Sequence, residues 1–88
     1  MPKVSLKIGN RRGLHARAAA KFVKLASLYN VEIMVTKNEQ SVSGKSIMGL
    51  LMLAAMPGDK ITLETKGLQA QEALSVLSNL VNKKFEER

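Results

Sequence analysis

His15 is the one histidine of this 88-residue chain, and it lies in Gly13-Leu14-His15-Ala16-Arg17, where a loop leads into an alanine-rich run. Glycine permits a sharp turn, and alanine strongly favours helix. The pattern therefore predicts that His15 lies at or beside the N-terminus of a helix. The first amides of a helix have no intrahelical partners and carry the positive end of its dipole, so this position suits a ring that carries an anion.

Two side chains of this stretch have the chemistry to handle a phosphoryl group. A neutral imidazole is a nucleophile, and the positive end of a helix favours the neutral ring. Arg17 adds a planar cation whose paired N–H groups match phosphate oxygens. A surface or core histidine without chemistry is the alternative interpretation, and spacing alone does not separate the two.

Length and composition exclude several classes of site. The chain is long enough for one small domain over residues 1–88, and it has no cysteine for disulfides or thiolate metal sites. It has no Gly-rich phosphate loop and no carboxylate cluster for magnesium, so neither a cofactor nor a metal is expected. It has no signal-peptide core and no apolar run that could span a membrane, which favours a cytoplasmic protein without membrane insertion.

The formal net charge of +7 is unevenly distributed. Seven basic residues precede the first acidic residue, Glu32, and the later basic and acidic residues are equal in number. Arg17, Lys21 and Lys24 have the spacing to share one helix face beside His15. Such a face attracts acidic proteins and would equally attract nucleic acid, while a solvated charged face is the simpler interpretation.

Hydrophobic periodicity predicts seven elements in the order β-α-β-β-α-β-α. Strands are expected at residues 4–8, 31–36, 41–43 and 61–66, and the second and third should form a hairpin. Helices are expected from residue 16 to about 28, after Ser46 to about 53, and along the apolar stripe of residues 70–81, which ends in a charged tail. The predicted fold class is α+β, with three helices on one face of a four-stranded, mainly antiparallel sheet.

The second helix is too apolar for a short surface element. Leu50 and Leu53 can face the core. Four further apolar residues cannot all do so on about two helical turns: Ile47, Met48, Leu51 and Met52. Exposed patches with methionine are typical of adaptable protein-binding surfaces, and a completed core is the alternative interpretation.

Two motifs carry a resemblance. Gly13-Leu14-His15-Ala16-Arg17, followed by Gly44-Lys45-Ser46-Ile47-Met48-Gly49, resembles the HPr family, the histidine-containing phosphocarriers of bacterial phosphotransferase systems. The resemblance covers nearly the whole chain and implies a single HPr-like domain with an open-faced sandwich fold. In that family the histidine accepts a phosphoryl group from enzyme I, itself charged by phosphoenolpyruvate, and passes it to enzyme IIA proteins. By resemblance, His15 is the carrier, through Nδ1, and Arg17 is its electrostatic partner in a covalent relay that is not an enzyme.

The resemblance also implies a docking surface for enzyme I and enzyme IIA, formed by the two helices that follow His15 and Ser46. Its apolar contacts would come from Leu14, Ala16, Ala20, Ile47, Met48 and Leu51. Its cationic rim would come from Arg17, Lys21, Lys24 and Lys45. A carrier that visits several partners through one face is expected to be a monomer.

Ser46 and Ala18 each need a further interpretation. Ser46 is a helix cap worth about 1 kcal/mol, and by resemblance it is also the regulatory serine that an HPr kinase/phosphorylase modifies in some bacteria. A phosphate there would add about two negative charges to a surface for acidic partners. Ala18 stands where the family usually has proline, which leaves open whether the chain serves sugar transport or the nitrogen-related regulatory branch.

Two other functions fit parts of the sequence. A pI near 10.1 and the basic helix fit nucleic-acid binding, but two phenylalanines, one tyrosine and no tryptophan are too few for a base-stacking platform. The other is a regulatory relative that binds partners without relaying phosphate, and the presence of His15 and Arg17 argues against it. Protein partners rather than nucleic acid are therefore expected.

Overall fold

The computed structural model of the chain describes residues 1–87. Four strands form one sheet: β1 (Lys3–Lys7), β2 (Glu32–Lys37), β3 (Gln40–Ser43) and β4 (Lys60–Lys66). Three helices and a short 3-10 turn complete the fold: α1 (Ala16–Ala26), α2 (Ile47–Met52), α3 (Ala70–Asn82) and η1 (Lys84–Glu86). The predicted fold class and order of strands and helices are confirmed. Over the part of the chain that is described, no helix has the length and hydropathy to cross a membrane.

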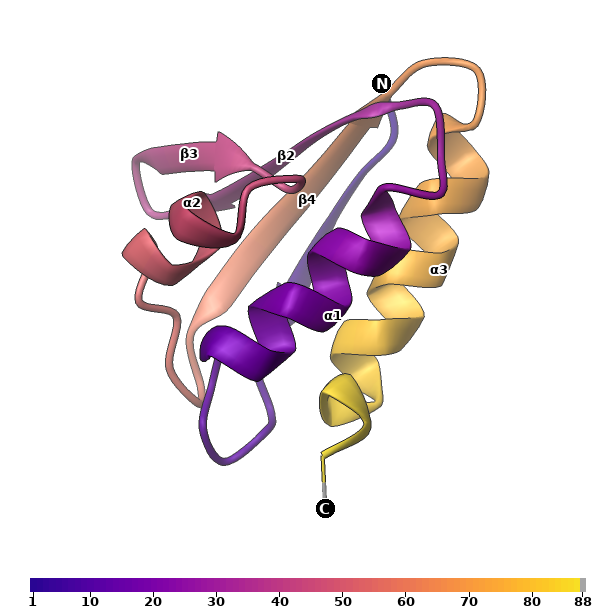
Figure 1. The fold of residues 1–88 in the computed structure, drawn as a ribbon. Coiled ribbons are helices and arrows are strands. Elements are labelled where there is room, and N and C mark those ends of the chain that lie inside the picture. Colours follow the sequence, from indigo (N-terminus) through magenta and orange to yellow (C-terminus); the bar gives the residue numbers. More distant parts are fainter. Residues whose placement is uncertain (88) are drawn as a thin grey trace.

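The sheet has the strand order β1-β4-β2-β3, and each neighbouring pair is antiparallel. Strands β2 and β3 form the predicted hairpin. Alternate side chains point to the helices, so that Val35 and Leu63, which are partners across β2 and β4, are both fully buried. The helices cover this one face and leave the other face open, as an open-faced sandwich requires (Figure 1).

Helices α1 and α3 lie side by side over the sheet, and α2 packs against α1 and β3 (Figure 1). Their apolar stripes meet the buried face of the sheet and form the core. The α3 stripe is buried as predicted: Ala70, Ala73, Leu74, Leu77, Leu80 and Val81. Helix α1 ends at Ala26, two residues before the predicted end; the amides of Leu28 and Tyr29 donate to carbonyl oxygens three residues back, and Leu28 is 72% exposed.

The loop before α1 is fixed against the segment that follows α2. Gly13 has a φ of 65°, which favours glycine, and a side chain there would overlap the backbone of Ala55. The amide of Leu14 donates to the carbonyl oxygen of Ala55 over 2.8 Å. Asn10 Nδ2 donates to the carbonyl oxygen of Gly13 over 2.7 Å. These contacts set the position from which α1 begins.

The C-terminal segment continues from the end of α3, and η1 contacts α1 (Figure 1). Lys84, Phe85 and Glu86 have φ angles of 57°, 55° and 60°, so the chain makes a left-handed turn there. The Phe85 ring is 1% exposed in the core, and its carbonyl oxygen accepts a hydrogen bond from Lys21 Nζ over 3.0 Å. The charged tail expected after the last helix is also a folded turn, because burial of this one aromatic ring anchors the segment.

Candidate functional site

His15 is the N-cap residue of α1, with φ −83° and ψ 179°, which confirms the predicted position. Its side chain makes no capping hydrogen bond to the helix. The amide of Ala19 donates to the carbonyl oxygen of His15, so the amides of Ala16, Arg17 and Ala18 have no acceptor within α1. The start of α1 therefore offers unpaired N–H donors and the positive end of the helix dipole beside the imidazole.

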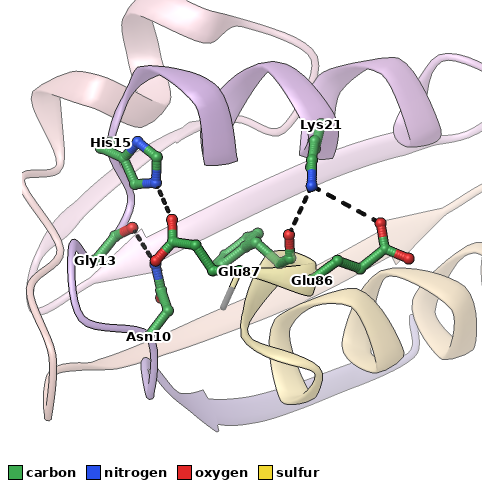
Figure 2. A network of polar contacts seen from close by, with 7 residues as sticks. Asn10, Gly13, His15, Lys21, Glu86 and Glu87 are labelled. Carbon is green, nitrogen blue, oxygen red and sulfur yellow. Dashed lines mark hydrogen bonds and ion pairs between the residues drawn. The ribbon is translucent and has the colours of Figure 1, made fainter.

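The imidazole is held by the C-terminal segment rather than by its own helix. His15 Nε2 contacts Glu87 Oε2, and Asn10 Nδ2 donates to Glu87 Oε1 over 3.1 Å (Figure 2). The side chains of His15 and Glu87 are 20% and 23% exposed. The hydrogen bond from Asn10 lowers the pKa of Glu87 below its ordinary 4.5, and the contact with His15 lowers it further. Glu87 is thus held in its ionised form.

Sequence reasoning missed both Asn10 and Glu87 as site residues. Asn10 is a loop asparagine, and nothing in its neighbourhood marked it for burial, yet its side chain is 1% exposed. Glu87 had one usable signal, because Phe85 is a lone aromatic residue in an otherwise charged tail. A buried Phe85 brings the next two residues to the start of α1.

A depression of about 520 Å³ surrounds the exposed edge of the ring and is lined by cationic side chains and the C-terminal segment. The cations that line it are Arg11, Arg12, Arg17 and Lys21. Their charges and the unpaired amides of α1 suit an anion such as a phosphoryl group. Within residues 1–87, no three His, Asp or Glu side chains gather as a metal site would require.

Comparisons with known proteins agree with this geometry. Residues 2–83 match the family described as PTS HPr component phosphorylation site. The chain belongs to the HPr family. The phosphocarrier protein HPr of Neisseria meningitidis serogroup A is 52% identical over 87 residues, which cover 99% of this chain and 98% of the relative. The family expected from the two sequence motifs is thereby confirmed.

Solved structures of HPr proteins share the fold. HPr-C-His from Thermoanaerobacter tengcongensis matches with a TM-score of 0.96 and 40% identity, over 100% of this chain and 99% of that chain. An HPr dimer from the same organism matches with a TM-score of 0.79 and 40% identity, over 99% of this chain and 100% of that chain. As a member of the HPr family, the chain is a phosphocarrier protein of the phosphotransferase system and not itself an enzyme.

The apolar residues expected on the HPr docking surface are mostly exposed, with one correction. Ala16 and Ala20 are exposed on α1, and Ile47 and Met48 are 41% and 68% exposed on the neighbouring α2. The assignment of Leu14 to this surface is wrong, because its side chain is 4% exposed in the core.

Two further α2 residues complete the picture of this surface. Leu51 is half-buried, and Met52 is 67% exposed. The excess of apolar residues on α2 therefore lies at the surface, as the length of the helix predicted. We call the exposed side chains of Ile47, Met48 and Met52 the α2 patch.

The four cations expected at the rim are divided between the two ends of α1. Arg17 and Lys24 are exposed. Lys21 donates to the carbonyl oxygen of Phe85 and lies 3.9 Å from a Glu86 carboxylate oxygen, so it is engaged by the C-terminal segment (Figure 2). Lys45 Nζ donates to the carbonyl oxygen of Tyr29 over 2.9 Å, beyond the C-terminal end of α1 and far from His15.

Ser46 is the N-cap of α2, as predicted, and its Oγ accepts a hydrogen bond from the amide of Gly49 over 3.0 Å. The start of α2 lies near the C-terminal end of α1, where Lys45 contacts Tyr29. The segment after α2 reaches the loop that precedes His15. Ser46 and His15 thus lie at opposite ends of α1, whose eleven residues span about 16 Å.

Proposed function

We propose that His15 of this phosphocarrier accepts a phosphoryl group from phosphorylated enzyme I and passes it to enzyme IIA proteins. One observation carries the proposal. The single imidazole of the chain is at the N-cap of α1, makes no capping hydrogen bond to the helix, and lies in a depression lined by four cationic side chains. The family supplies the partner classes. We propose that residues 1–88 act as one phosphocarrier domain in the cytoplasm, where phosphoenolpyruvate is available to enzyme I.

The chemistry needs little from the carrier beyond a nucleophile and an anion site. A lone pair of the His15 ring forms a new N–P bond while the N–P bond of the donor breaks, and that electron pair returns to the donor nitrogen. The Arg17 guanidinium and the unpaired amides of Ala16 and Arg17 bind the oxygens of the phosphoryl group. Positioning of the donor phosphoryl group for in-line transfer falls to the partner enzyme.

We propose that enzyme I and enzyme IIA dock on the α2 patch together with Ala16 and Ala20 of α1. Apolar side chains that remain exposed on two packed helices, one of which begins at the reactive histidine, are suited to transient protein contacts. Arg17 and Lys24 then provide the cationic rim that attracts acidic partners. Since one face serves both donor and acceptor, we propose that the carrier acts as a monomer, which size-exclusion chromatography tests.

The deciding experiment is incubation with phosphoenolpyruvate, magnesium and enzyme I, followed by intact-mass analysis before and after mild acid. We expect one acid-labile phosphate on the parent chain and none on His15→Ala. Ser46→Ala serves as the matched control, because it removes a hydroxyl that this reaction does not use. Absence of uptake by the parent chain with enzyme I from the same organism would falsify the proposal.

Transfer of the phosphoryl group from His15 to an enzyme IIA protein tests which branch of the phosphotransferase system the chain serves. The phosphorylated chain is mixed with an enzyme IIA of the sugar-transporting branch and, separately, with one of the nitrogen-related branch. Faster loss of the phosphate to one of the two identifies the physiological acceptor class. Ala18, which stands in place of the usual proline, is exchanged for proline in the same assay to test whether it contributes to the choice.

We propose that phosphorylation of Ser46 by an HPr kinase/phosphorylase weakens the docking of enzyme I. Ser46 begins the helix that carries the α2 patch, so a phosphate there places about two negative charges beside a surface for acidic partners. Ser46→Asp should slow phosphoryl uptake at His15, whereas Ser46→Asn, an equally good helix cap without charge, should not. Equal rates for the two variants would contradict this regulatory role.

A further inference from the structure

Asn10, Glu87 and His15 form a chain of polar contacts that fixes the state of the imidazole (Figure 2). An ionised carboxylate only accepts hydrogen bonds, so this contact favours the tautomer of the neutral His15 ring that has its proton on Nε2. In that tautomer Nδ1 holds the lone pair. It has no hydrogen-bond partner among the residues that the structure describes, and it lies on the side of the ring away from Glu87 (Figure 2).

The arrangement that brings Glu87 to the ring is unfavourable in two places. Three consecutive residues of the C-terminal segment adopt left-handed backbone angles, which are disfavoured for L-residues other than glycine. Asn10 is buried, and within the described chain its Oδ1 has no hydrogen-bond partner. Strain and unpaired buried polar atoms gather at functional sites, where the rest of the fold holds them in place. Here Phe85 and Lys21 hold the segment.

The following inference rests on the proposed function. We propose that Glu87 is a positioning residue for phosphoryl transfer. It orients the His15 ring so that Nδ1 faces the incoming phosphorus, and its negative charge stabilises the positive charge that the ring acquires.

The transfer step shows why a carboxylate is suited to this position. The Nδ1 lone pair forms the bond to phosphorus, and the bond from phosphorus to the donor nitrogen breaks with its electron pair. Nε2 keeps its proton, so the ring becomes a cation. A carboxylate on Nε2–H stabilises that cation, as the aspartate of a serine protease does for its catalytic histidine.

The other charged groups around the ring make this stabilisation necessary. Arg11, Arg12, Arg17 and Lys21 all line the depression and oppose a second positive charge on the ring. Among the described residues that line the depression, Glu86 carries the other carboxylate, and it points to Lys21 rather than to His15 (Figure 2). Within residues 1–87, Glu87 is therefore the lining carboxylate placed to balance the imidazolium.

The test compares Glu87→Ala, Glu87→Gln and Glu86→Gln in the full chain. The first variant removes the acceptor and the charge, the second keeps an acceptor without charge, and the third removes the same charge one residue away. With enzyme I and phosphoenolpyruvate, we expect uptake to slow about tenfold for Glu87→Ala and about threefold for Glu87→Gln. Glu86→Gln should stay within about twofold of the parent chain.

Nitrogen-15 NMR of the His15 ring supplies a readout that needs no enzyme. We expect a protected Nε2–H resonance in the parent chain and in Glu86→Gln, and its loss in Glu87→Ala. An unchanged resonance in Glu87→Ala overturns the proposed contact. Transfer by Glu87→Ala at the parent rate overturns the positioning role, and faster transfer overturns it in favour of a blocking segment.

The two proposals fail in distinguishable ways. A parent chain that takes up no phosphoryl group overturns the function proposed for His15 and the transfer role of Glu87 with it. Normal uptake by the parent chain together with normal uptake by Glu87→Ala overturns only the role of Glu87.

Discussion

Helices α1 and α2 begin in opposite ways, although both N-cap residues have extended backbone. Ser46 turns its hydroxyl onto its own helix and accepts a hydrogen bond from the amide of Gly49. His15 makes no such bond, and its ring contacts Glu87, 72 residues further along the chain. The start of α2 is closed by a local contact, whereas the start of α1 is left open for a ligand.

The difference shows that the two helix starts serve different purposes, one for stability and one for chemistry. A capping side chain stabilises a folded protein by about 1 kcal/mol, and α1 lacks this contribution. In return, three amides at the start of α1 remain without an acceptor in the helix beside the one imidazole of the chain. The large exposed apolar side chains of the proposed docking surface lie on α2, which is the helix with the capped start.

The largest effect is expected when the start of α1 receives a capping side chain like the one at the start of α2. His15→Asn places a good capping side chain at the open start and removes the nucleophile. We expect complete loss of acid-labile phosphate, measured by intact mass, and a Tm no lower than that of the parent chain. A large drop in Tm would mean that His15 is needed for the fold, and the division between the two helix starts would then be wrong.

The second test removes the cation at the open start. Arg17 is exposed, so Arg17→Ala should change the free energy of unfolding by less than about 0.5 kcal/mol. Phosphoryl uptake should slow by about tenfold or more, because a charged donor to the phosphoryl oxygens is lost. Lys66→Ala removes an exposed cation from β4 and should transfer normally. An equal slowing of both variants would show that Arg17 acts only through net charge, and normal transfer by both would show that Arg17 has no role in the reaction.

The third test removes the capping side chain of α2. Ser46→Ala leaves the amide of Gly49 without its acceptor and should destabilise the fold by about 1 kcal/mol. For a domain of this size, thermal melts should show a Tm lower by about 4–8 °C. Uptake at His15 should be unchanged at a temperature where both chains are folded. A variant that melts normally but transfers slowly would place Ser46 in the chemistry instead.

A smaller effect is expected from Ala18→Pro, in the first turn of α1. Proline is tolerated there, since the amide of Ala18 has no acceptor within the helix. Reduced freedom of the unfolded chain should stabilise the protein by about 0.4–1 kcal/mol, seen in denaturant unfolding. If phosphoryl uptake falls sharply as well, the Ala18 amide is one of the donors that hold the phosphoryl group.

The smallest expected effect is a pH dependence of stability, which should be present for the contact at the start of α1 and absent for the cap of α2. The pKa of Glu87 lies below its ordinary 4.5, first because of Asn10 and then because of His15. Its contribution to stability is therefore complete above pH 4.5 and is lost as the pH falls through the lowered pKa. The parent chain should melt above Glu87→Gln at pH 7, and the difference should vanish in acid. Ser46→Ala should show a gap in Tm that does not depend on pH, because a serine hydroxyl does not titrate.

Much of the fold follows from the sequence because its signals are local. Alternation in residues 61–66 predicted a strand that lies within β4, and the stripe of residues 70–81 predicted α3. Ser46 was recognised as a cap because the capping bond reaches only three residues along the chain. The position of His15 was predicted for the same reason, from the glycine before it and the alanines after it.

The remainder of the site depends on contacts between distant segments. No local pattern places Glu87 beside His15 or buries Asn10, since both results depend on how Phe85 packs after α3. Leu14 was misassigned to the surface for a related reason. Its amide is bonded to Ala55, and this pairing with the segment after α2 turns its side chain into the core.

Because Glu87 follows the left-handed turn at residues 84–86, the site is completed only after its other residues have been synthesised. Helix α1 and its histidine leave the ribosome early, but the carboxylate that contacts Nε2 arrives only once residue 87 has been added. Contact across so long a stretch of chain carries an entropy cost, because the ends of a long loop must be brought together. An unfinished or truncated chain therefore displays His15 without the contact that orients it. The His15 ring is in contact with Glu87 only in a chain whose C-terminal segment has folded.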